Sequence, residues 1–235
     1  MKRNIVSFSG GKDSTAMLLM LLERGEHVEE ILYFDTGWDF PEMDAHIKEV
    51  EELTGMKVTR LKPKQSFEYL MFEHPVVSSK TGELSCVGYG WPSAMRRWCT
   101  REKSRALRTY LRGLEFKDIP GDIVVHIGFA SDEAHRVDKQ RKDIDRYELR
   151  FPLIEWGVDE KAALEYCKDK GLSWGGLYNH FKRVSCYCCP LQSMATAQVL
   201  KNNYPDLWNK MLQMESRITH EPGKRFLHEY KVSDL

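Results

Sequence analysis

The segment Ser9-Gly10-Gly11-Lys12-Asp13-Ser14 brings together residue types that bind anions. It follows an apolar run at 4–8 and opens into a second apolar run at 15–22, an order that predicts a strand, a tight turn and a helix. Glycines let the backbone turn sharply and approach a ligand closely. The N–H groups of a helix start, with Lys12 and two serine hydroxyls, suit a phosphate. The spacing differs from the common P-loop, and the alternative is a Gly-Gly turn without a ligand.

Three cysteines form a second group of reactive side chains. Cys186 and Cys189 make a C-x-x-C, a spacing that lets two thiolates reach one metal or exchange a disulfide, with Cys188 between them and Pro190 after them. In a reducing compartment, such cysteines are expected to be ligands or redox groups rather than disulfides. Cys167 lies in a predicted helix and is expected to be part of the core. The six cysteines of the chain are Cys86, Cys99, Cys167, Cys186, Cys188 and Cys189.

Two basic segments could bind a polyanion. At about 100° per residue, five arginines fall on one stripe of the helix predicted from about 96 to 112. These are Arg97, Arg101, Arg105, Arg108 and Arg112. A second cluster follows at Arg136, Lys139, Gln140, Arg141 and Lys142. A solvated face is the alternative for both, but Glu102 is the one acid within the first, which favours a nucleotide or a nucleic-acid backbone.

The elements that must hold these residues alternate between strand and helix. Strands are predicted at 4–8, 30–34, 56–61 and 121–129, and helices at 15–22, 42–54, 96–112, 159–170, 192–201 and 206–218. This alternation predicts an α/β fold with a doubly wound, Rossmann-like and mostly parallel sheet flanked by helices. Gly55 should cap the helix at 42–54, and Asp159 and Gly171 the helix between them. Residues 62–93 are the least regular, either a lid or an insertion. We predict an α/β domain over 1–160 and a small helical extension with the cysteine cluster over 161–235.

Composition narrows the class of protein. The 235 residues carry 35 basic and 35 acidic side chains, so the net charge alone indicates neither a nucleic-acid nor a membrane partner. No apolar run reaches the roughly 18 residues of a membrane span, and the run after Lys2-Arg3 is too short for a signal peptide. We therefore expect a cytoplasmic protein without a membrane partner.

Six segments, in order, resemble the ATP pyrophosphatases, the adenine-nucleotide alpha-hydrolase superfamily with a HUP-type fold. They are SGGKDS at 9–14, DTGWDFPE at 35–42, WCTREK at 98–103, GFASDEAHR at 128–136, PLIEW at 152–156 and RVSCYCCP at 183–190. The later segments are similar to the PAPS reductase-like branch, which includes the DndC-like sulfurtransferases. Members cleave ATP between the alpha and beta phosphates. The intact SGGKDS, and the absence of a cysteine in 232–235, distinguish the chain from assimilatory PAPS reductases.

The resemblance implies a nucleotide site. The expected ATP and pyrophosphate contacts are Ser9, Gly10, Gly11, Lys12, Asp13, Ser14, Asp35, Thr36 and Gly128. The expected catalytic residues are Lys12, Asp13, Asp35 and Glu133, with Mg²⁺ bound beside the pyrophosphate. Substrate contacts are expected from Arg97, Arg101, Arg105 and Arg136. Asp35 could serve the ribose, the adenine or the metal, or be a turn former only. Ala130 stands where the family has an arginine, which argues against assuming the same substrate.

The same resemblance pairs Cys99 with Cys186 and Cys189. Three thiolates and an open position would suit a 4Fe–4S cluster that binds sulfide. Four ligands, with Cys188 or Cys86 added, would suit a structural Zn²⁺ or a fully ligated cluster. A cysteine persulfide remains the option if iron is absent.

We therefore predict an ATP-dependent sulfurtransferase that adenylates its substrate, releases pyrophosphate and inserts sulfur. DNA phosphorothioation or tRNA thiolation are its concrete forms, and a cysteine desulfurase is the expected sulfur donor. A homodimer is compatible with the sequence. The alternatives are an APS or PAPS reductase using a cluster, an ATP sulfurylase-like adenylyltransferase, and a nucleotide sensor that does not cleave ATP.

Overall fold

The computed structural model describes residues 2–94, 96–115, 123–138, 147–184, 186–227 and 229–235. The chain forms two compact units that interleave in sequence. The first unit comprises Met1–Asp35, Phe40–Leu61 and Ser104–Val184. The second comprises Thr36–Asp39, Lys62–Lys103 and Ser185–Leu235. Residues 161–184 thus belong to the first unit, and the division into 1–160 and 161–235 stays a prediction about domains.

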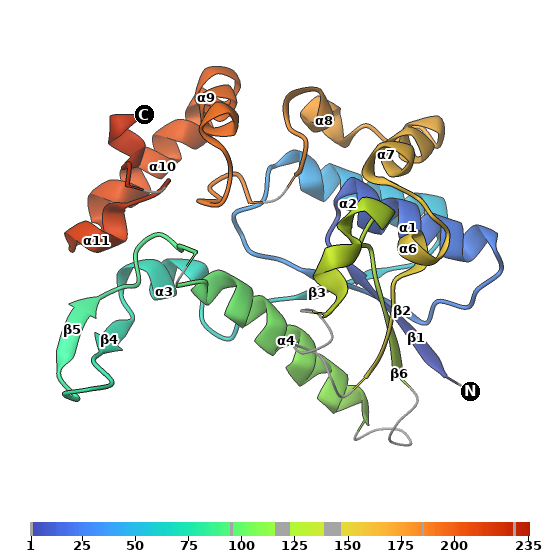
Figure 1. Cartoon of the computed structure of the whole chain (residues 1–235), viewed down its shortest axis with the longest axis horizontal. Helices are drawn as coiled ribbons and strands as arrows, with labels where there is room; N and C mark the ends of the chain where they lie inside the picture. Colours follow the sequence, from blue (N-terminus) through green and yellow to red (C-terminus); the bar gives the residue numbers. More distant parts are fainter. Residues whose placement is uncertain (1, 95, 116–122, 139–146, 185, 228) are drawn as a thin grey trace. The chain divides into compact units, whose positions relative to one another are not determined.

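The first unit is built on a five-stranded sheet in the order β3-β2-β1-β6-β7, and every neighbouring pair is parallel (Figure 1). Its strands are β1 (Arg3–Phe8), β2 (Glu30–Phe34), β3 (Val58–Leu61), β6 (Ile123–Ile127) and β7 (Glu148–Arg150). Its helices are α1 (Lys12–Glu23), α2 (Glu42–Thr54), η1 (Ser131–Arg136), α6 (Pro152–Glu155), α7 (Glu160–Asp169), η2 (Trp174–Gly176) and α8 (Leu177–His180). The predicted mostly parallel α/β fold is confirmed.

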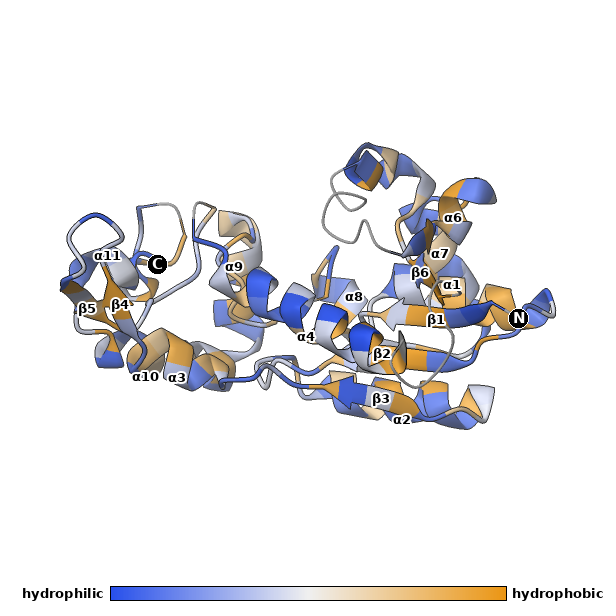
Figure 2. Ribbon diagram, turned by 90° about the horizontal axis from the view of Figure 1, so that it is seen from below, coloured by the Kyte–Doolittle hydropathy of each residue, from blue (hydrophilic) through white to orange (hydrophobic). Residues whose placement is uncertain are grey.

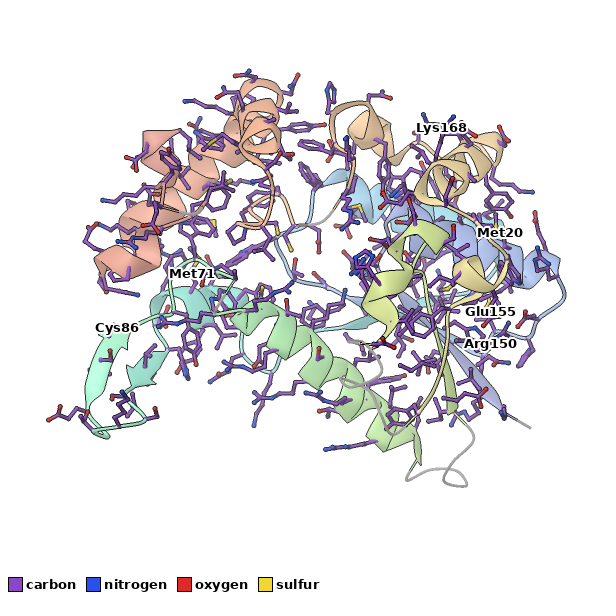
Figure 3. The ribbon with its side chains drawn as sticks, in the orientation of Figure 1. Met20, Met71, Cys86, Arg150, Glu155 and Lys168 are labelled. Carbon is purple, nitrogen blue, oxygen red and sulfur yellow. The ribbon has the colours of Figure 1, made fainter. Side chains whose placement is uncertain are left out.

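The core of the first unit forms where α4 (Trp98–Glu115) packs on the sheet. Its buried side chains Leu107, Leu111 and Leu114 lie against the apolar residues of β6, which is buried along its whole length. A strand buried on both faces needs a continuous apolar run rather than alternation, as its sequence has. The opposite stripe of α4 is hydrophilic (Figure 2). At the sheet edge, Arg150 of β7 binds Glu155 at 2.7 Å and Glu26 at 2.6 Å; Figure 3 labels the first pair.

The second unit is mostly helical. Its elements are α3 (Phe67–Phe72), the antiparallel pair β4 (Pro75–Val77) and β5 (Leu84–Val87), α9 (Met194–Asn203), α10 (Pro205–Arg217), α11 (Glu221–Lys224) and η3 (Val232–Asp234), together with residues 98–103 of α4. Residues 62–93, predicted to be irregular, thus contain a helix and a hairpin. In the described part of the chain, no helix is both long and apolar enough to cross a membrane.

His46 of α2 is a buried histidine that should make stability depend on pH. Its Nε2 lies 3.0 Å from Thr15 Oγ1, and its ring stacks on Trp174 with centroids 4.3 Å apart. Burial lowers the pKa of His46 from 6.5 to about 4. Between these values the unfolded chain binds a proton that the folded chain does not, so stability is complete above pH 6.5 and is lost as the pH falls towards 4. The expected loss in free energy of unfolding is about 3 kcal/mol.

Urea unfolding between pH 7 and pH 4.5 tests this expectation. His46→Gln should show a smaller loss of stability on acidification than the wild type. His27→Gln, at an exposed histidine of the same unit, should leave the pH dependence unchanged. Parallel curves for the wild type and His46→Gln would show that another group is responsible.

Candidate functional site

The segment Ser9–Ser14, which we call the corner, joins the central strand β1 to α1 in the first unit. β1 ends at Phe8 and α1 begins at Lys12, and β1 separates the strands that precede it in the sheet order from β6 and β7 (Figure 1). Ligands of open α/β sheets bind at such a switch point, outside the carboxyl ends of the strands. Gly10 has φ +75°, a conformation that other residues rarely adopt. The predicted strand, turn and helix are therefore present in that order.

Hydrogen bonds within the corner fix its serines. Ser14 Oγ accepts from Ser9 N at 3.1 Å, lies 3.0 Å from Ser9 Oγ and donates to the Gly11 carbonyl at 3.0 Å. Trp174 Nε1 donates to the Gly10 carbonyl at 2.7 Å. Trp174 is buried, so the turn is held from outside by a rigid ring.

Gly128, directly after β6, allows the backbone of this strand end to approach α1. A Cβ at position 128 would lie 2.7 Å from Ser14 Cα and 2.9 Å from Ser14 N. Because both neighbours are backbone atoms, they cannot move aside as a flexible side chain could. The role of Gly128 in nucleotide binding stays a prediction. Its close approach to Ser14 explains why a glycine is needed at this position.

Gly128→Ala should destabilise the protein by about 1–3 kcal/mol, the usual cost of forcing extra volume into a packed site. Gly113→Ala is the matched control, since a Cβ there meets nothing within 4 Å and alanine favours the helix. Thermal unfolding of both variants measures the difference. Equal melting temperatures for the two would contradict the close approach.

Lys12 is a buried member of a network of charges. Its ammonium is 2.8 Å from Glu160 Oε2 and 3.1 Å from Asp13 Oδ2, and its side chain is 5% exposed. Burial raises the pKa of Asp13, although the Lys12 charge acts in the other direction. For Glu160, burial opposes ionisation, but hydrogen bonds from Lys12 and Arg183 hold its pKa below the ordinary value. The network therefore stabilises an ionised Glu160 beside Lys12.

The predicted residues Glu133 and Arg136 belong to the same network. Arg136 Nη1 donates to Glu133 Oε1 at 2.7 Å. Arg183 donates to this oxygen and, at 3.1 Å, to Glu160 Oε1. Arg136 also lies over the Phe129 ring, with 4.2 Å from its guanidinium carbon to the ring centroid. The structure thus brings together four predicted residues, Lys12, Asp13, Glu133 and Arg136.

Two residues of the network, Glu160 and Arg183, were not predicted as site residues. Arg183 is the first residue of the segment RVSCYCCP, in which we predicted a role for the cysteines only. Glu160 follows Asp159, whose side chain caps α7 by accepting from Ala162 N at 2.7 Å. The place of Arg183 in a segment that resembles the family was the one signal in the sequence that could have indicated either residue.

Asp35 and Thr36 follow β2, but they belong to different units. The Asp35 amide donates to the Leu61 carbonyl at 2.8 Å, and its carboxylate charge acts on Arg60. Thr36 Oγ1 donates to Asp39 Oδ2 at 2.9 Å in the second unit. Their predicted contacts with ATP stay predictions.

The predicted thiols lie in the second unit. The Cys186 thiol donates to Thr36 Oγ1 at 3.3 Å and to Asp39 Oδ1 at 3.8 Å. Cys99 and Cys189 lie near enough to Cys186 to contribute to the raised pKa of its thiol. Burial, followed by the Asp39 charge, raises the pKa of Cys186 well above its usual value, and burial also raises the pKa of Cys99 and Cys188. Cys188 is buried beside them, whereas Cys86 lies on β5 of the hairpin (Figure 3). Cys167 is fully buried in the first unit, as predicted.

A pocket of about 480 Å³ opens beside this thiol group, within the second unit. Its lining includes Thr36, the partner of Cys186, and the aromatic rings of Trp38, Phe67 and Tyr187. Lys210 and Gln213 of α10 add polar groups. An aromatic wall with a few polar groups suits a flat, polar ring.

The thiols match a cluster or zinc by donor type, since thiolates bind both. In the part of the chain that is described, however, no three His, Cys, Asp or Glu side chains converge as metal ligands. The Cys186 thiol is instead turned to the oxygens of Thr36 and Asp39.

The arginines of the first basic segment lie on α4 or directly before it. Arg97, Arg101, Arg105 and Arg112 are exposed, and Arg108 is half-buried. Arg101 lies beside the Tyr89 ring, 5.9 Å from guanidinium carbon to ring centroid. Of the second cluster, Arg136 pairs with Glu133, whereas Lys139, Gln140, Arg141 and Lys142 fall outside the described residues. Binding of a polyanion by these arginines stays a prediction.

Comparison with known proteins identifies the family. The model of the phosphoadenosine phosphosulfate reductase domain matches residues 3–192. Two uncharacterized proteins of Methanocaldococcus jannaschii are 26% and 25% identical over 88% and 92% of the chain. The chain spans only 40% and 48% of their lengths. The solved structure of the U34-tRNA thiolase NcsA from Methanococcus maripaludis with its 4Fe–4S cluster aligns at TM-score 0.47 and 15% identity, over 92% of this chain and 72% of that chain.

The family match covers all six segments, from SGGKDS at 9–14 to RVSCYCCP at 183–190, which confirms the resemblance seen in the sequence. The chain belongs to the phosphoadenosine phosphosulfate reductase domain family, within the PAPS reductase-like ATP pyrophosphatases.

Proposed function

We propose that the protein is an ATP-dependent sulfurtransferase that adenylates its acceptor and replaces an acceptor oxygen by sulfur. The observation that carries the proposal is that one chain holds both an intact Ser-Gly-Gly-Lys-Asp-Ser corner and a group of interacting thiols. The first suits cleavage of ATP, and the second suits the handling of sulfur. Membership of the PAPS reductase domain family supports sulfur chemistry in general.

In the first step, the pyrophosphate part of ATP would lie against the Ser9–Ser14 corner with Mg²⁺. An acceptor oxygen attacks the alpha phosphorus, the bond between that phosphorus and the bridging oxygen breaks, and pyrophosphate leaves. Backbone N–H groups and Lys12 would stabilise the charge that develops on the leaving group. The acceptor then carries AMP, which is a good leaving group.

In the second step, sulfur displaces AMP. A donor such as a cysteine desulfurase would load Cys186 as a persulfide, whose terminal sulfur attacks the acceptor atom that bears AMP. The bond from this atom to the AMP oxygen breaks. The Cys189 thiolate then attacks Cys186 Sγ and releases the thiolated acceptor, which leaves a Cys186–Cys189 disulfide for an external thiol to reduce. A 4Fe–4S cluster held by Cys99, Cys186 and Cys189 would supply bound sulfide instead.

A nucleic acid is the acceptor that we propose. The exposed arginines of α4 suit a phosphate backbone, and the 480 Å³ pocket beside Cys186 has aromatic walls of the kind that bind a base. tRNA thiolation and DNA phosphorothioation remain the two concrete forms. A reductase of PAPS is the rival, and it needs no ATP cleavage.

The test incubates the full chain with ATP, Mg²⁺, a thiol, and bulk tRNA or duplex DNA, together with sulfide or a desulfurase and cysteine. Pyrophosphate release and mass spectrometry of the digested nucleic acid are measured. Nucleic-acid-dependent pyrophosphate release with thiolated nucleotides supports the proposal. Reduction of PAPS to sulfite without any pyrophosphate from ATP would overturn it. Iron, zinc and sulfide contents of protein purified without oxygen decide between a cluster, a structural zinc and a persulfide.

A further inference from the structure

The corner is surrounded by cations that are matched one for one by carboxylates. Lys12, Arg136 and Arg183 pair with Asp13, Glu133 and Glu160. Ion pairs of this kind could serve only to hold the helices together. Two contacts, however, place protein oxygens on the donors that a phosphate would need.

The first of these contacts is made by Glu160. Its two carboxylate oxygens divide between two cations, with Oε2 2.8 Å from Lys12 Nζ and Oε1 3.1 Å from an Arg183 nitrogen. A bridging phosphate group binds a lysine and an arginine in the same way. Glu160 is also the first residue of α7, where a carboxylate is favoured by the helix dipole. Its backbone is thereby fixed while its side chain, 27% exposed, can turn to solvent.

The second contact is made by Tyr178 of α8. Its hydroxyl accepts a hydrogen bond from the backbone N–H of Lys12, at 2.7 Å. This N–H belongs to the first residue of α1 and has no partner within the helix. It is therefore one of the donors that a helix start offers to an anion. The two protein oxygens thus occupy a side-chain donor and a backbone donor of the same residue.

The position of Arg183 would allow it to exchange Glu160 for a phosphate. It is 62% exposed and shares Glu133 with Arg136, while its bond to Glu160 links it to the pair formed by Lys12. Release of Glu160 would leave Arg183 tied to Glu133, near the corner, with donors to spare. A guanidinium has five N–H donors, enough to keep one carboxylate and bind a phosphate.

We propose that Arg183 is a further phosphate-binding side chain, and that Glu160 and Tyr178 are internal substitutes for phosphate oxygens, which the nucleotide displaces. The inference rests on the proposed binding of ATP at the corner and names the residues that gate it.

Calorimetric titration with inorganic pyrophosphate, and with an ATP analogue that is not cleaved between the alpha and beta phosphates, tests the proposal at low salt. Glu160→Gln should tighten binding roughly tenfold, because Lys12 and Arg183 lose a competing anion, and Tyr178→Phe should tighten it severalfold. Arg183→Gln should weaken binding roughly tenfold. Glu165→Gln, an exposed acid of the same helix, and Lys182→Gln, the exposed neighbour of Arg183, are charge-matched controls.

Unchanged or weaker binding by Glu160→Gln, with Arg183→Gln binding like the wild type, would overturn the proposal and leave a structural ion pair. If Glu160→Gln does not fold, Arg183→Gln alone decides, since its exposed side chain is not expected to be needed for folding. A wild-type protein that binds neither ligand would instead refute the proposed nucleotide site itself.

Discussion

Lys12→Gln is expected to reduce pyrophosphate release from ATP by roughly 10²- to 10³-fold, the usual effect of removing one preorganised charge or donor from a developing anion. The ammonium lies at the start of α1, where the charge of the leaving pyrophosphate would develop. Glutamine keeps a hydrogen-bond donor towards Asp13 and Glu160, whereas alanine would remove it and leave Glu160 with Arg183 alone. The measurement is pyrophosphate release at saturating ATP, with thermal unfolding to verify the fold.

Two comparisons make the Lys12 result specific. Lys161→Gln removes a lysine of the same unit whose side chain is 84% exposed, and it should retain full activity. The double variant Lys12→Gln, Glu160→Gln restores the charge balance and should be more stable than Lys12→Gln, yet equally inactive. If the double variant regains pyrophosphate release, Lys12 matters only for charge balance and not for the reaction.

Cys186→Ser is expected to abolish sulfur transfer, by at least roughly 10²-fold, while pyrophosphate release stays within about twofold of the wild type. A serine hydroxyl cannot carry a persulfide. It can still donate to Thr36 and Asp39, so the local hydrogen bonds are retained. Quantifying thiolated nucleotides and pyrophosphate in the same reaction separates the two steps.

Cys86→Ser is the control for the thiol experiment. Its thiol donates to the Gly88 carbonyl at 3.6 Å within the hairpin segment, and its loss should affect neither step. Loss of sulfur transfer in Cys86→Ser would make Cys86 a member of the thiol group. Full sulfur transfer by Cys186→Ser would show that the proposed sulfur site is wrong.

Much of the first unit could be predicted because local signals agree there. The strand 30–34 and the helix 42–54 have the predicted bounds, since an apolar run ends at a polar loop and Gly55, at φ +67°, stops the helix. β7 was missed because three residues, Glu148–Arg150, are too few for any periodicity. Its place in the sheet comes from pairing with β6, which is a tertiary effect.

The hairpin and α3 within 62–93 were also missed. Ser66 caps α3 by accepting from Tyr69 N at 3.1 Å, but a six-residue helix has too few turns to show a periodic pattern. In the candidate site, the residue types indicated which side chains take part. The sequence did not indicate which of them form ion pairs with one another. Glu160 and Arg183 are 23 positions apart, and only the folded chain decides which cation meets which carboxylate.

The interleaving of the two units has a consequence for the synthesis of the chain and for its division into parts. The chain passes from one unit to the other five times, after Asp35, Asp39, Leu61, Lys103 and Val184. The central strand β1 leaves the ribosome early, but its neighbour β6, in register Ile5 with Val125, follows much later. A single cut or gene fusion point within the chain therefore cannot separate one complete unit from the other.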